Sequence, residues 1–133
     1  MRGQPPAIHG DGEQTRDFTY VDDVVEATML AALETKSVGE VFNVASGTEI
    51  KINELRQYIA KLTGNYTPPE YVDKRDIDNI RRRVLNIEKM RRMLRWAPTV
   101  NIYKGLEKTY EWLLAKKSGV EKRNIVSLNA KSL

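Results

Sequence analysis

The sequence contains no cysteine and only one histidine, His9, among its 133 residues. The missing cysteines exclude disulfide bonds, thiolate metal sites and a cysteine nucleophile, and no cluster of metal-binding side chains surrounds His9. No apolar run approaches the roughly 20 residues of a membrane-spanning helix, and the first residues contain no apolar signal core. With 41% hydrophobic and 30% charged residues, the composition is that of a globular protein, which we expect to be cytoplasmic.

Positive charge is unevenly distributed along the chain, although the net charge is only +4. Residues 1–73 carry 6 basic and 12 acidic side chains, whereas residues 74–96 carry 9 basic and 3 acidic ones. A basic segment of this kind suits a phosphorylated small molecule or a nucleic acid, and it also suits a helix face exposed to water. Composition alone leaves these three interpretations open.

Hydrophobic spacing predicts a chain of short strands and about four helices. Strands are expected at 7–9, 16–21 and 41–45, with a further one at either 71–72 or 84–85. Helices are expected at about 22–36, 52–62, 87–94 and 101–117, with Asp22 or Asp23, and Asn86, as N-caps and Gly64 as a stop. We expect one domain over residues 1–117 and a polar, disordered tail over residues 118–133.

Arginine side chains provide the strongest chemical signal, because a guanidinium group can grip two phosphate oxygens at once. Arg16 lies where a strand is expected, and Arg75 and the run Arg81–Arg83 follow in the basic segment. By contrast, Asp22 and Asp23 indicate helix capping rather than a catalytic carboxylate pair. No glycine-rich phosphate loop opens a predicted helix, so neither a dinucleotide fingerprint nor a Walker motif is present.

Residues 10–27, which read Gly-Asp-Gly-Glu-Gln-Thr-Arg-Asp-Phe-Thr-Tyr-Val-Asp-Asp-Val-Val-Glu-Ala, resemble a segment of the extended short-chain dehydrogenases. This family includes UDP-glucose 4-epimerase and the nucleotide-sugar dehydratases. Residues 41–47, 55–64 and 87–98 are similar to later segments of the same family, in the same order. The resemblance covers about residues 4–116.

The resemblance implies a set of nucleotide-sugar contacts at matching positions. Arg16 and Arg75 would contact the diphosphate, Asp78 the ribose, and the extended stretch Ala7, Ile8 and His9 the base. Two of these positions depart from the family pattern. His9 stands where the family usually has tyrosine or phenylalanine, and Arg75-Asp76-Ile77-Asp78 replaces Arg-Pro-Gly-Asp. Arg81–Arg83 are therefore an alternative source of the second diphosphate contact.

The family's catalytic apparatus has no counterpart in this sequence. The resemblance implies an N-terminal Rossmann domain that binds NAD, and a Tyr-x-x-x-Lys pair that moves the proton. None of the six tyrosines is followed by lysine four positions later. We therefore expect no cofactor to be bound by this chain and no activity from the chain alone, with no catalytic residues and no metal.

The sequence thus predicts an α/β fold that corresponds to the C-terminal, nucleotide-sugar-binding part of an NAD-dependent epimerase or dehydratase. In the parent enzymes residues 22–45 pack on the nucleotide domain, so we expect self-association or a separate Rossmann domain as a partner. A stand-alone nucleotide-sugar-binding module and a basic nucleic-acid-binding module are the two alternatives. The nucleic-acid alternative is the weakest, because no aromatic side chains alternate with the arginines.

Overall fold

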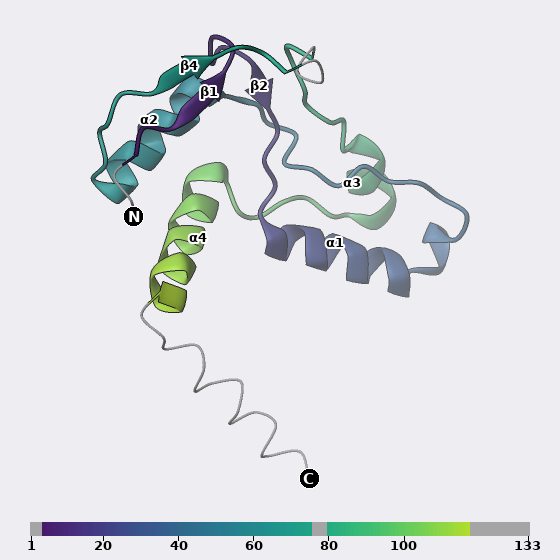
Figure 1. The fold of residues 1–133 in the computed structure, drawn as a ribbon. Helices are drawn as coiled ribbons and strands as arrows, with labels where there is room; N and C mark the ends of the chain where they lie inside the picture. The colour runs from purple at the N-terminus through teal and green to yellow at the C-terminus, as the bar shows by residue number, and fades with distance from the viewer. Residues whose placement is uncertain (1–3, 76–79, 118–133) are drawn as a thin grey trace.

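The computed structural model describes residues 4–75 and 80–117, and over these residues the chain has the predicted α/β fold with four α-helices (Figure 1). Its elements in chain order are β1 (Ala7–His9), β2 (Thr15–Arg16), α1 (Val21–Leu33), a 3-10 turn η1 (Thr35–Ser37), β3 (Ile50–Lys51), α2 (Ile52–Thr63), β4 (Glu70–Val72), α3 (Glu88–Leu94) and α4 (Ile102–Lys117). The predicted tail, 118–133, lies outside the described residues. Within the described part no helix is both long and apolar enough to cross a membrane.

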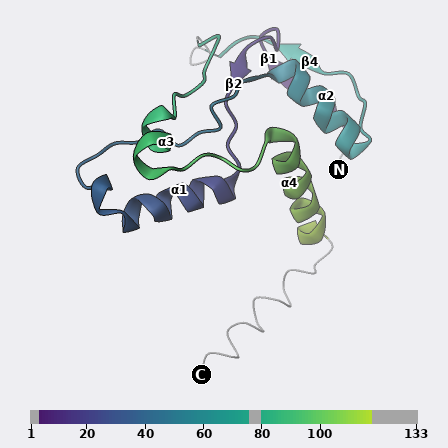
Figure 2. The same cartoon turned by 180° about the vertical axis from the view of Figure 1, so that it is seen from behind.

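Two separate pairs of short strands tie distant parts of the chain together. β1 pairs in parallel with β4, with Ile8 opposite Tyr71, and β2 pairs antiparallel with β3, with Arg16 opposite Ile50. The strand at 7–9 was predicted correctly, and of the two alternatives further on, 71–72 is the one that forms a strand. Figures 1 and 2 show β1, β4 and α2 gathered at one end of the molecule and α1 and α3 at the other.

Helix α2 closely follows its predicted bounds, but backbone groups cap its start. Lys51 is the N-cap residue and makes no side-chain capping bond. Instead, the amides of Ile52 and Asn53 donate to the carbonyl oxygens of Gln14 and Gly12 at 3.1 and 2.9 Å. The loop between β1 and β2 therefore satisfies the first donors of the helix, which water would otherwise have to satisfy. At the other end Gly64 adopts a left-handed conformation with φ +69°, as expected of a helix stop.

The prediction that Asp22 or Asp23 caps α1 was wrong. The helix starts at Val21, directly after Tyr20, so both aspartates lie inside its first turn, and the strand predicted at 16–21 is limited to Thr15–Arg16. Asp23 is 1% exposed. Its carboxylate accepts from the amide and hydroxyl of Thr99, both at 2.9 Å, and from the amide of Val100 at 3.1 Å. Asp23 thus fastens the segment before α4 to the start of α1.

The core of the α1 end is built on Trp96 and Met90, which are 3% and 0% exposed. They pack with Ala27 of α1 and Leu94 of α3, and partly buried Phe42 and Val44 cover this cluster. Trp96 follows the end of α3 at Leu94. The predicted N-cap Asn86 lies one residue before the observed N-cap residue, Ile87, and its side-chain oxygen accepts from the amide of Glu88 at 2.8 Å.

The strand predicted at 41–45 does not form, because the described residues offer it no partner strand. The segment belongs to neither of the two strand pairs. Val41 and Asn43 take part in hydrogen bonds with side chains: Lys89 donates to the carbonyl of Val41, and the Asn43 side chain donates to the carbonyl of Asn86. A strand requires a neighbour for its backbone groups, and hydrophobic spacing cannot reveal whether one exists.

Candidate functional site

Strand β1 and the segment after β4 form one continuous surface. The amide of Gly10 donates to the carbonyl of Val72 at 2.8 Å, and His9 Nδ1 donates to the carbonyl of Asp73 at 3.0 Å. Ile8 is 4% exposed, so its side chain points into the protein, whereas Ala7 is exposed and His9 half-buried. An open hollow of about 530 Å³ borders this pair of strands. It is lined by Gly10, Asp11, Tyr71, Val72, Asp73 and Lys74.

Arg16 is held in place by the segment that follows the basic stretch. Its Nη1 donates to the carbonyl of Thr15 at 2.7 Å and to the carbonyl of Ile80 at 3.0 Å. Beside it, the amide of Thr15 donates to the carbonyl of Arg81 at 3.0 Å. A guanidinium fixed by two backbone oxygens loses little rotamer freedom when a ligand arrives, which favours binding.

Arg75 lies on the chain between the two attachment points just described. Asp73 is bonded to His9, and Ile80 is bonded to Arg16, so both ends of this stretch are fastened next to β1 and β2. Arg75 itself is exposed. Asp78, the predicted ribose contact, lies outside the described residues. The structure thus places Ala7, His9 and Arg16 on two strands joined by one short loop, and convergence of Arg16 with Arg75 stays a prediction.

Three ion pairs surround this surface and hold part of the arginine run. Asp11 pairs with Arg81 at 2.7 Å, Glu13 with Lys51 at 2.8 Å, and Glu49 with Arg82 at 2.5 Å. The hydrogen bond from each cation lowers the pKa of the Asp11, Glu13 and Glu49 carboxyl groups below its ordinary value. A diphosphate contact from Arg81 or Arg82 would have to break such a pair.

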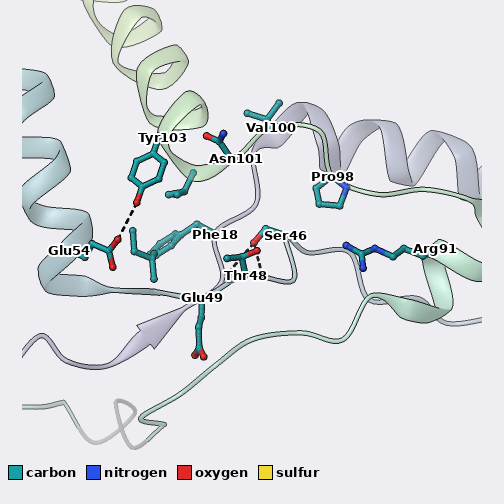
Figure 3. Close-up of a pocket in the computed structure, with 12 residues that line it drawn as sticks. Phe18, Ser46, Thr48, Glu49, Glu54, Arg91, Pro98, Val100, Asn101 and Tyr103 are labelled. Atoms are coloured by element: carbon teal, nitrogen blue, oxygen red, sulfur yellow. Dashed lines mark hydrogen bonds between the residues drawn. The ribbon is translucent and has the colours of Figure 1, made fainter.

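A second hollow, a cavity of about 450 Å³, was not predicted from the sequence (Figure 3). Phe18, Ser46, Thr48, Glu49, Ile50, Glu54, Arg91, Pro98, Val100, Asn101, Ile102 and Tyr103 line it. These residues come from four separate parts of the chain, so no local pattern marks the cavity. None of the predicted contact residues that the structure describes is among them.

The two tyrosines that join α2 to α4 beside this cavity do not suit proton abstraction. The rings of Tyr58 and Tyr103 lie 4.7 Å apart between centroids. The hydrogen bond from Tyr103 to Glu54 raises the pKa of Tyr103, and burial together with a bond to Glu107 raises that of Tyr58. Both hydroxyls therefore stay protonated at neutral pH, whereas a catalytic tyrosine base needs a lowered pKa.

Asp17 holds the loop that forms one wall of the cavity. Its carboxylate accepts from the amide and hydroxyl of Ser46 and from the amide of Gly47, at 3.0, 2.5 and 3.0 Å, and from the amide of Leu85 at 3.4 Å. Sequence reasoning missed this role, although Asp17 belongs to the motif that drew attention to Arg16. The motif therefore places Arg16, which is bonded to backbone carbonyls, next to an aspartate that organises loops.

The described residues do not form a cradle for a dinucleotide. A Rossmann pyrophosphate site needs a glycine-rich turn immediately before a helix, so that amides can approach the phosphates closely. The turns before α1, α2, α3 and α4 lack that pattern, and Gly105 lies inside α4. In the described part of the chain no group of His, Asp and Glu side chains is arranged to hold a metal ion either.

Comparison with known families shows to which family the chain belongs. The family model described as GDP-mannose 4,6 dehydratase matches residues 1–109. The chain belongs to this family. The family match covers the strand pairs, the Arg16 motif and α1–α3, so the resemblance drawn from residues 10–27 is confirmed.

The matching relatives act on UDP-sugars, according to their names. A UDP-N-acetyl-alpha-D-glucosaminuronate decarboxylase of Bacillus cytotoxicus is 37% identical over an alignment 117 residues long. The alignment covers 84% of this chain and 36% of that protein. The crystal structure of a Thermotoga maritima UDP-glucose 4-epimerase with UDP-glucose aligns with a TM-score of 0.80 at 35% identity. That alignment covers 86% of this chain and 36% of the epimerase.

A second solved relative contains NAD. UDP-glucuronic acid 4-epimerase of Bacillus cereus, solved with UDP-glucuronic acid and NAD, aligns with a TM-score of 0.77 at 31% identity. The alignment covers 83% of this chain and 35% of that enzyme. The chain therefore spans only about a third of the length of the enzymes that it resembles.

Proposed function

We propose that this chain is the C-terminal, nucleotide-sugar-binding portion of an NAD-dependent epimerase or dehydratase, and that it is inactive without the remainder of the enzyme. Arg16 and Arg75 grip the diphosphate, Asp78 contacts the ribose, and the surface of β1 from Ala7 to His9 receives the base. Relatives that align with 86% and 83% of this chain were solved with UDP-glucose and UDP-glucuronic acid, which supports a UDP-sugar as the ligand.

The anchoring of Arg16 is the observation that carries this proposal. Its guanidinium is fixed by Ile80, next to a β1 surface that is fixed by Asp73. The two hydrogen bonds attach residues 73 and 80, on either side of Arg75 in the chain, to β1 and β2. A charged hydrogen bond from such a donor contributes about 1.5–3 kcal/mol to binding.

Isothermal titration of UDP-glucose into the chain tests the grip on the diphosphate. Arg16→Ala is expected to weaken binding by about tenfold or more, which corresponds to the loss of one or more charged hydrogen bonds. Arg16→Lys should recover part of that loss, because lysine keeps the charge but not the fork. Arg75→Ala is expected to act in the same direction.

Arg92→Ala provides the matched control, because Arg92 is an exposed arginine on α3, away from β1 and β2. It removes the same charge and should leave the affinity for UDP-glucose unchanged. Equal weakening by Arg92→Ala and Arg16→Ala would show a general charge effect and would contradict the proposed site.

The two other candidate functions make different predictions in the same experiments. A stand-alone binding module would bind UDP-glucose tightly without any other polypeptide, whereas a portion of an enzyme should bind it weakly. A nucleic-acid-binding module would show a steep salt dependence with RNA or DNA. The pairing of Arg81 and Arg82 with Asp11 and Glu49 removes two cations from the surface that such a partner would need.

A further inference from the structure

Residues 80–82 lie along strand β2 and anchor the guanidinium of Arg16. The carbonyl of Ile80 accepts from Arg16 Nη1 at 3.0 Å, and the carbonyl of Arg81 accepts from the amide of Thr15 at 3.0 Å. Arg82 forms a parallel β-bridge with Thr15. Strand β2 is only two residues long. The orientation of Arg16 therefore depends on how firmly this segment is held against the strand.

The carboxylate of Glu49 joins strand β2 to the segment that carries Arg82. Its Oε2 accepts from the hydroxyl of Thr15 at 2.5 Å. Its Oε1 receives Nε and Nη2 of Arg82 at 2.6 and 2.5 Å. The backbone next to Glu49 is fixed as well, because Ile50 of β3 pairs with Arg16 of β2. Glu49 thus connects three separate parts of the chain at the point where Arg16 is anchored.

Glu49 is better placed for this task than Asp11, the other carboxylate that reaches the same segment. Asp11 forms an ion pair with Arg81 in which the two side chains are 53% and 55% exposed. The side chain of Glu49 is only 23% exposed, and both of its oxygens accept hydrogen bonds. Exposed ion pairs contribute little, whereas hydrogen bonds shielded from water are stronger. Glu49 is therefore the stronger of these two side-chain links to residues 80–82.

We infer that Glu49 is a positioning residue for the diphosphate grip: it keeps residues 80–82 against β2, so that the Arg16 guanidinium is already oriented when a nucleotide sugar arrives. The inference rests on the proposed function and adds to it a residue that acts through Arg16. Glu49 is not itself a diphosphate contact, because a carboxylate repels phosphate oxygens. Its contribution is preorganisation, which reduces the conformational entropy lost on binding.

The sign of the effect separates positioning from simple charge. Removal of a negative side chain beside an anion-binding surface strengthens binding by electrostatics alone, whereas positioning predicts that Glu49→Ala weakens it. NMR titration of the whole chain with UDP-glucose measures the change even when binding is weak. We expect Glu49→Ala to weaken binding about threefold to tenfold, which lies in the usual range of coupling between contacting residues.

Thr15→Val tests the same link without any change of charge. It removes the hydroxyl that Glu49 accepts and keeps a branched side chain that suits a strand. Binding of UDP-glucose should weaken in the same direction, by about twofold to threefold. Glu49→Gln is the conservative variant: it keeps one acceptor oxygen and should recover part of the affinity that Glu49→Ala loses.

A double-mutant cycle shows whether Glu49 acts through Arg16. In the Arg16→Ala chain no guanidinium is left to position, so the further change Glu49→Ala should alter the affinity for UDP-glucose by less than about twofold. A role in general stability, or a direct contact with the ligand, would instead give the same fold-loss with and without Arg16.

Glu107→Ala is the matched control. The Glu107 carboxylate also accepts from one hydroxyl and one cation, those of Tyr58 at 3.1 Å and Lys104 at 3.2 Å, but it joins α2 to α4. The variant removes the same charge and a comparable pair of hydrogen bonds. It should lower the melting temperature of the chain and leave the affinity for UDP-glucose unchanged.

Four results would overturn the inference: unchanged or stronger binding by Glu49→Ala, equal weakening by Glu49→Ala and Glu107→Ala, unchanged binding by Thr15→Val, and equal losses from Glu49→Ala with and without Arg16. If Glu49→Ala does not fold, Thr15→Val takes its place in the cycle. Arg16→Ala alone distinguishes the two proposals. If it leaves the affinity unchanged, the proposed site fails; if it weakens binding while Glu49→Ala and Thr15→Val do not, only the positioning role fails.

Discussion

The short extended segments at the two ends of the molecule differ in whether they pair with another strand. Residues 7–9 find a partner in residues 70–72, and the loop after them caps α2, so this end satisfies its own backbone. Residues 41–45 have a similar strand-like composition, yet within the described part of the chain they pair with no strand. The difference shows that residue types alone do not decide which extended segments pair.

Breaking the link between the two ends should have the largest effect. Asp23→Ala removes the carboxylate that holds Thr99 and Val100, and it leaves donors buried without an acceptor. The expected loss is about 3 kcal/mol of unfolding free energy, measured by chemical denaturation. The neighbouring substitution Asp22→Ala is the control. Asp22 is exposed and forms an ion pair with Lys108 at 3.6 Å. An exposed pair contributes little, so the change should stay within about 0.5 kcal/mol.

Two glycines with nearly the same backbone angle sharpen the comparison. Gly12 has φ +74° and Gly39 has φ +75°. A Cβ on Gly12 would lie 2.1 Å from Asn53 Oδ1, whereas a Cβ on Gly39 would meet no atom within 4 Å. Gly39→Ala should therefore cost only the left-handed conformation, about 1 kcal/mol, and Gly12→Ala about 2–3 kcal/mol. Similar denaturation midpoints for the two variants would contradict this account of the β1–β2 loop.

The smallest effect concerns acid stability at the self-paired end. The pKa values of Asp11, Glu13 and Glu49 are lowered from ordinary values of 3.8, 4.5 and 4.5 by their cationic partners. A lowered pKa means that the stabilisation is complete above these ordinary values and is lost as the pH falls through and below them. The melting temperature should therefore fall as the pH drops below about 4.5. Arg82→Gln should remove the part of this fall that is due to Glu49. Because these groups are exposed, added salt should reduce the effect.

The helices that were predicted well are those whose ends and buried faces are set by residues within the helix or directly beside it. The spacing of apolar residues and Gly64 predicted α2, and Asn86 predicted the start of α3 to within one residue. The errors share one cause, which is dependence on a distant partner. Asp23 is a typical capping residue by position, but its acceptors are used by Thr99 and Val100, more than seventy residues later.

The candidate site was predicted in the same partial way. The motif around Arg16 drew attention to this arginine. The hydrogen bond to Ile80 that fixes its side chain joins segments 64 residues apart, and no periodicity in the sequence reveals it. The cavity beside Tyr103 was missed for the same reason, since its walls are assembled from separated segments. The strand at 41–45 was predicted from its residue types, which do not reveal whether a partner strand lies beside it.

The capping of α2 by the carbonyls of Gly12 and Gln14 has a consequence for the exchange of parts between related proteins. The 10–16 loop and strand form a single unit with the start of α2, although nearly forty residues separate them in the chain. A graft that moves the Arg16 motif without residues 50–53 would leave the recipient helix with uncapped amides. Recombination between family members should therefore succeed at crossover points that keep these two segments from the same parent.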